Sequence, residues 1–157
     1  MAENPDYREL LQHLNDSQVE YLVVGGYAVM KYGEPRFTKD LDVWVNNTPE
    51  NAACVHQALE HFGAPLEQDQ ITRATFAQRQ TVYQIGIAPV RIDIISEITG
   101  VRFSDAWKNR VAGSLFGVKV DFISFEDLIR NKEATRRDTD LDQLKRIAEI
   151  RDKQQKR

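Results

Sequence analysis

The spacing of apolar residues changes several times along the first third of the chain, and each change predicts a new element. Apolar residues recur at helical spacing after Asp6, a plausible N-cap residue. A short, wholly apolar run follows and ends at Gly25-Gly26, which is typical of a buried strand leading into a turn. The predicted elements are, in order, a helix over 6–16, a strand over 21–24, a short helix over 28–32 and a strand over 40–45.

The rest of the chain continues this alternation of helices and strands. Thr48-Pro49 is a strong helix start, and an apolar stripe runs from there to Gly63. Residues 64–80 are polar and predict a loop or a short strand. The further predictions are a hairpin of 81–87 and 90–95, a short helix over 103–111, an exposed or edge strand over 118–123, and two closing helices after Ser124. Together these elements predict one α+β domain over residues 1–157, frayed at 1–5 and 152–157, with a mixed sheet of about five strands flanked by helices.

Composition narrows the class of protein. The chain has 157 residues, 41% of them hydrophobic and 29% charged, as expected for one globular domain. We find no apolar run of membrane-spanning length and no signal-peptide pattern, and therefore expect a cytoplasmic protein with no membrane partner. The net charge is -3, but residues 130–157 hold ten Lys/Arg and six Asp/Glu. This basic segment could meet a triphosphate or an RNA backbone, or could be a solvated helix face.

Three aspartates are the candidates for chemistry. Asp40 and Asp42 lie two apart in a predicted strand, so their carboxylates share one face. Asp93 stands in a mostly apolar strand and needs a partner, either Arg91 or a cation. If the two strands are neighbours, three carboxylates converge, and such hard oxygen ligands favour Mg²⁺ or Mn²⁺. They could hold two cations, one on nucleotide phosphates and one on an attacking hydroxyl.

The glycine pair fits the same site. Glycine lets backbone approach a phosphate closely, and the helix after Gly25-Gly26 presents its N–H groups there. The motifs Val24-Gly25-Gly26 and Asp40-Leu41-Asp42-Val43, with Asp93 in a separate strand, resemble the nucleotidyltransferase superfamily of the DNA polymerase beta type. Within it, the chain is most similar to small bacterial and phage proteins related to the AbiEii/MenT-type toxin nucleotidyltransferases. The similarity covers roughly residues 20–145 and includes 84–95, 124–128 and 131–135.

The resemblance implies a magnesium-dependent transfer of a nucleoside monophosphate from a nucleoside triphosphate to an acceptor, with release of pyrophosphate. It implies that Asp40 and Asp42 are metal ligands, and that Asp93 is the third ligand and the base. By the same resemblance, Gly25 and Gly26 would hold the triphosphate.

Four further residues take roles by the same resemblance. Thr38 would orient a phosphate or the first carboxylate, and Lys132 with Arg137 would neutralise triphosphate charge. Asp140 would orient Lys132. The chain departs from relatives at Gln143, where a second acid is common.

Other interpretations stay open on the sequence alone. Asp40 and Asp42 could form a solvated strand face, and Asp93 could pair structurally with Arg91. The acceptor could be a tRNA or other RNA end, a hydroxyl of a partner protein in a toxin-antitoxin or phage-defence setting, or a small molecule such as an antibiotic. A non-catalytic nucleotide-binding or partner-binding module on the same fold is the alternative of a different class. The sequence leaves the nucleobase and the oligomeric state open.

Overall fold

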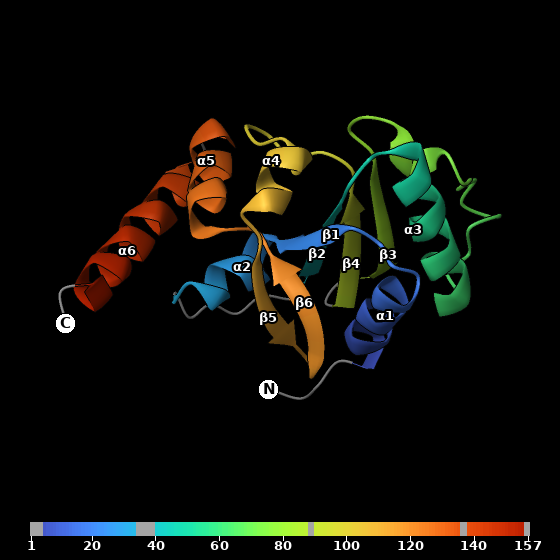
Figure 1. Cartoon of the computed structure of the whole chain (residues 1–157), viewed down its shortest axis with the longest axis horizontal. Coiled ribbons are helices and arrows are strands. Elements are labelled where there is room, and N and C mark those ends of the chain that lie inside the picture. The colour runs from blue at the N-terminus through green and yellow to red at the C-terminus, as the bar shows by residue number, and fades with distance from the viewer. Residues whose placement is uncertain (1–4, 34–39, 88–89, 136–137, 156–157) are drawn as a thin grey trace.

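The computed structural model describes residues 5–33, 40–87, 90–135 and 138–155. Its centre is a six-stranded mixed sheet with the strand order β3-β4-β2-β1-β6-β5 (Figure 1). The strands are β1 (Tyr21–Val24), β2 (Asp40–Val45), β3 (Val82–Ile87), β4 (Val90–Ile95), β5 (Val111–Leu115) and β6 (Val118–Phe122). The helices are α1 (Pro5–Asp16), α2 (Gly25–Lys31), α3 (Pro49–Phe62), α4 (Phe103–Lys108), α5 (Phe125–Thr135) and α6 (Asp138–Gln155), with the 3-10 helix η1 (Thr75–Ala77) before β3.

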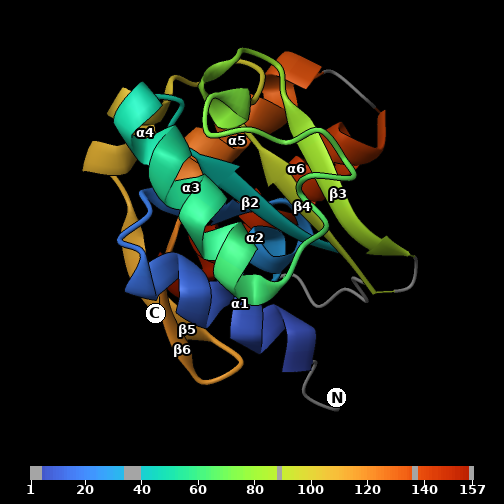
Figure 2. The same cartoon turned by 90° about the vertical axis from the view of Figure 1, so that its right-hand side faces the viewer.

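Helices α1 and α3 pack side by side and cover one face of the sheet (Figure 2). On this face β2 presents Leu41, Val43 and Val45, all fully buried. Because side chains alternate along a strand, Asp40 and Asp42 project to the opposite face, where α2 contacts β1 and β2. Burial of one face of β2 therefore determines which face its carboxylates occupy.

Several sequence predictions are confirmed. The side-chain oxygen of Thr48 accepts a hydrogen bond from the Asn51 backbone N–H at 3.2 Å, and α3 ends at Gly63 in the left-handed conformation, with φ +97°. Strands β3 and β4 form the predicted antiparallel hairpin. The predicted α+β class and mixed sheet are also confirmed, with six strands in place of about five.

Other predictions are wrong in the second half of the chain. Strand β6 is not at the edge, because it lies between β1 and β5, and its apolar side chains are buried. The strand at this edge of the sheet is β5, whose sequence Val-Ala-Gly-Ser-Leu has little strand propensity, and β5 is stabilised by pairing with β6. As a result, α4 ends at Lys108, before the predicted end at Val111. For residues 64–80, by contrast, the first of the two predicted alternatives, a loop, is confirmed: this segment contains turns and η1.

Candidate active site

The three aspartates meet because β2 and β4 are adjacent parallel strands. In their register Asp42 lies opposite Asp93, and Asp40 lies opposite Arg91. Side chains two apart on a strand share a face, so these four residues form a two-by-two array on the face that carries α2. The strands of Asp40 and Asp93 are thus neighbours, and the three carboxylates converge as predicted for that case.

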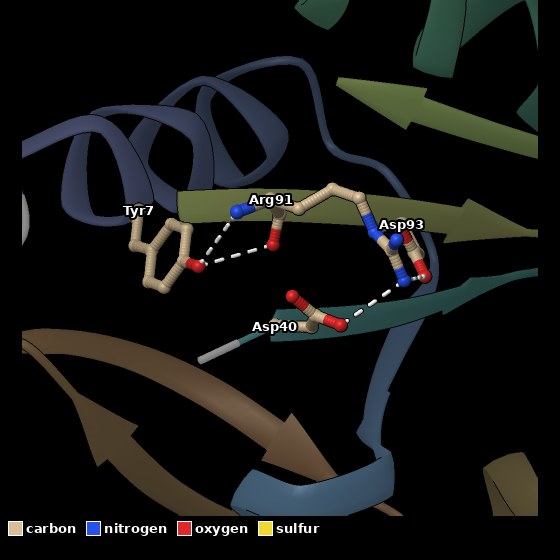
Figure 3. Close-up of polar contacts among 4 residues, drawn as sticks. All are labelled: Tyr7, Asp40, Arg91 and Asp93. Carbon is tan, nitrogen blue, oxygen red and sulfur yellow. Dashed lines mark hydrogen bonds and ion pairs between the residues drawn. The ribbon is translucent and has the colours of Figure 1, made fainter. Parts of the chain in front are cut away.

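Arg91 binds two of the three carboxylates directly (Figure 3). Its Nε donates to Asp93 Oδ1 at 2.9 Å, and its Nη2 donates to Asp93 Oδ2 at 3.2 Å and to Asp40 Oδ2 at 3.0 Å. The Asp93 side chain is 12% exposed, whereas that of Asp40 is 36% exposed. Arg91, one of the two partners predicted for Asp93, binds it in the structure. The same guanidinium also joins β4 to β2 through Asp40.

Asp42 lies against Gly25, the first residue of α2. A Cβ atom at Gly25 would overlap the Asp42 carboxylate, and Gly25 has φ +69°, a conformation that glycine adopts without strain. The predicted role of Gly25 was to approach a phosphate. The structure adds a different requirement, because any side chain at this position would displace a candidate metal ligand.

The surroundings of Asp42 disfavour its charged form. Burial, followed by the charges of Asp93 and Asp40, raises the pKa of Asp42 from 3.8 to about 7. The positive charges of Arg91 and Lys132 lower this pKa, but their effect is smaller. Negative charge therefore exceeds positive charge around Asp42.

The remaining predicted residues differ in how far the structure describes them. Lys132 lies in α5, is buried, and acts electrostatically on Asp42, in agreement with a place near the site. Thr38 and Arg137 lie outside the described residues. Asp140 falls within α6, and its side chain is outside the described part.

Tyr7 is a residue of the site region that the sequence did not indicate. Its hydroxyl donates to the backbone oxygen of Arg91 at 3.0 Å and accepts from the Arg91 backbone N–H at 3.1 Å (Figure 3). Burial is the largest cause that raises the pKa of Tyr7 to about 12. The sequence predicts Tyr7 only as one member of an apolar helix stripe. Its partner Arg91 is 84 residues away, so no local pattern indicates this contact.

A cavity of about 610 Å³ opens beyond the C-terminal ends of β2 and β4. Trp44 lines it and lies on the same face of β2 as Asp42, two residues away. Its rim carries three ion pairs, namely Arg79–Glu97, Arg102–Asp105 and Arg130–Asp127. This volume is in the range of ligand pockets, but none of the three carboxylates lines the cavity.

The donor chemistry fits a divalent cation, although the side chains are not arranged around one. Within residues 5–33, 40–87, 90–135 and 138–155, no group of three or more His, Cys, Asp or Glu side chains is placed to hold a metal ion. In this arrangement Arg91 binds both Asp40 and Asp93. When ionised, the three carboxylates carry a charge of -3, which Arg91 and Lys132 offset only in part, and this remaining negative charge would attract a divalent cation.

The six-stranded mixed sheet flanked by helices is an α+β fold shared with a solved protein. A crystal structure of a Thermotoga maritima protein described as a "putative nucleotidyltransferase" has this fold, with a TM-score of 0.57 and 15% sequence identity, over 99% of this chain and 97% of that one. The chain belongs to the family described as nucleotidyl transferase of unknown function (DUF2204), whose model matches residues 3–157.

Two further observations concern known protein sequences and membrane-spanning helices. No curated protein sequence matches the chain. Among the helices in the described part of the chain, none is long and apolar enough to cross a membrane.

Proposed function

We propose that this protein transfers a nucleoside monophosphate from a nucleoside triphosphate to an acceptor hydroxyl and releases pyrophosphate, with Mg²⁺ or Mn²⁺ as the cofactor. The observation that carries the proposal is the array on β2 and β4, where three carboxylates lie together and Arg91 binds two of them. Such an array is costly to folding unless it binds something positive. Membership of the nucleotidyl transferase family supports the same reaction class.

Each residue would have a separate task. Asp40, Asp42 and Asp93 would hold the divalent ion, which supplies charge neutralisation on the phosphates when it is bound. Asp93 would accept the proton of the acceptor hydroxyl as its oxygen forms a bond to the α-phosphorus. The bond from that phosphorus to the pyrophosphate oxygen breaks, and the pyrophosphate leaves with its electron pair. Lys132 would offset the negative charge that collects on the leaving group.

The resemblance assigns the other contacts of the triphosphate. Gly25 and Gly26, at the start of α2, would lie beside it, with Thr38, Arg137 and Asp140 completing the site. These assignments are part of the proposal.

The acceptor we favour is an RNA end or a hydroxyl of a partner protein, in a cytoplasmic toxin-antitoxin or phage-defence setting. The basic segment over 130–157, which includes α6, would meet an RNA backbone.

The test is transfer of label from each of the four α-labelled nucleoside triphosphates, with Mg²⁺ and a cell extract. We compare wild type with Asp93→Asn, which keeps the shape and removes the base. The control is Asp121→Asn, because Asp121 is also on a strand and also pairs with an arginine, Arg110, at 3.6 Å. We expect Asp93→Asn to lose at least about 100-fold in rate and Asp121→Asn to keep wild-type activity.

The destination of the label then identifies the acceptor class. Label in RNA or in protein supports one of the two favoured acceptors, whereas label in a small molecule identifies an antibiotic-type enzyme. Equal transfer by wild type and Asp93→Asn would refute the assigned site. Nucleotide binding with no release of pyrophosphate over long incubation would instead identify a non-catalytic module.

A further inference from the structure

We propose that Arg91 occupies the place of a divalent cation in the metal-free protein and competes with the metal for Asp40 and Asp93. This inference rests on the proposed function, since it takes the three carboxylates as metal ligands. Arg91 is then a positioning residue that sets metal affinity, a role separate from catalysis.

The contacts of Arg91 are those expected of a bridging cation. Its guanidinium binds Asp93 through Nε and Nη2, at 2.9 Å and 3.2 Å, in the bidentate geometry that an arginine fork allows. The same Nη2 reaches Asp40 on the neighbouring strand at 3.0 Å. One positive group thus joins carboxylates from β2 and β4, which is the task that a metal ion would perform between the same oxygens.

The backbone of Arg91 is held in place, so only its side chain needs to move. Arg91 lies between β2 and β3 in the sheet, opposite Asp40 and Gly86. The Tyr7 hydroxyl also binds both its backbone N–H and its backbone oxygen. In contrast, the side chain is 32% exposed, and its carbon chain can rotate toward solvent without a change in strand pairing.

Electrostatics gives the direction of the effect. A guanidinium beside the site repels an incoming cation and also holds the oxygens that the cation needs. In the metal-free protein the same guanidinium reduces repulsion among the carboxylates. Loss of Arg91 should therefore strengthen metal binding and weaken the metal-free fold.

The test measures binding of Mn²⁺ alone, by electron paramagnetic resonance of the free ion, with no nucleotide. We compare wild type with Arg91→Gln. The control is Arg79→Gln. Arg79 binds Glu97 in the same bidentate manner, at 3.3 Å and 3.2 Å, but Glu97 is not one of the three candidate metal ligands. We expect Arg91→Gln to bind Mn²⁺ at least about tenfold more tightly than wild type, and Arg79→Gln to bind as wild type does.

Arg91→Lys and a stability measurement serve if Arg91→Gln folds poorly. A lysine keeps the charge but lacks the fork, so we expect an Mn²⁺ affinity between those of wild type and Arg91→Gln. The rise in unfolding midpoint on adding Mn²⁺ should follow the same order. Unchanged or weaker Mn²⁺ binding in both Arg91 variants would overturn the inference.

Asp42→Asn separates this outcome from failure of the proposed function. If Arg91→Gln and the double variant Arg91→Gln/Asp42→Asn bind Mn²⁺ equally poorly, the carboxylates are not a metal site and the proposed function fails with the inference. If Asp42→Asn loses the binding that wild type shows, but Arg91→Gln binds as wild type does, only the role of Arg91 is refuted.

Discussion

Asp42→Asn should stabilise the metal-free protein at neutral pH, although Asp42 is a candidate metal ligand. The folded protein holds the Asp42 proton more tightly than the unfolded chain, since the pKa rises from 3.8 to about 7. Below pH 4 the carboxyl is protonated in both states, so its charge has no cost. Between pH 4 and pH 7 the unfolded chain has released this proton while the folded protein still holds it, so stability falls as the pH rises and the loss is complete above the folded pKa of about 7.

The size of the effect follows from the pKa. One pKa unit corresponds to about 1.4 kcal/mol, so a rise from 3.8 to about 7 would amount to ~4 kcal/mol for a fully enclosed carboxyl. Asp42 is only half-buried, and solvent screens part of the repulsion. We therefore expect Asp42→Asn to raise the free energy of unfolding by about 2 kcal/mol at pH 8, and by much less at pH 4.

Urea unfolding in EDTA, at several values between pH 4 and pH 8, measures this difference. Asp105→Asn is the control, because the Asp105 side chain is 60% exposed and Asp105 is not among the charged groups that shift the pKa of Asp42. The control should change stability by less than about 0.5 kcal/mol throughout. The reasoning is refuted if Asp42→Asn is no more stable than wild type at pH 8, or if its gain does not shrink toward pH 4.

Two other substitutions test the packing around the site. Tyr7→Phe keeps the buried ring but removes the hydroxyl that binds both backbone groups of Arg91. Urea unfolding should therefore show that the free energy of unfolding falls by about 1–3 kcal/mol. An unchanged midpoint would mean that water replaces the hydroxyl without cost. Gly25→Ala should destabilise more than Gly117→Ala, since φ is +69° and +79° respectively, but only the Cβ at Gly25 would overlap Asp42. Equal losses in the two variants would show that backbone conformation, and not the contact, requires the glycine.

Much of the fold could be predicted locally. The start of α3 at Thr48-Pro49 and its end at Gly63 depend on residues within one helical turn. In contrast, β5 contains Gly113 and Ser114 and forms because β6 lies beside it. The position of β6 inside the sheet was missed for the same reason, because alternation describes the faces of a strand and not its number of neighbours.

The candidate site shows the same division. The sequence by itself determined that Asp40 and Asp42 share a strand face and that Asp93 needs a positive partner, because both follow from strand periodicity and the cost of burying a charge. Only the tertiary structure decided that Asp42 faces Asp93 and that Arg91 binds across to Asp40.

The same holds for the contact of Asp42 with Gly25 and for the two hydrogen bonds of the Tyr7 hydroxyl. The Arg91–Asp40 bond joins residues 51 apart, the Tyr7–Arg91 bonds join residues 84 apart, and the Asp42–Gly25 contact depends on the antiparallel pairing of Val24 with Asp42. No local pattern carries such information, because register is set by burial of the opposite face of the sheet.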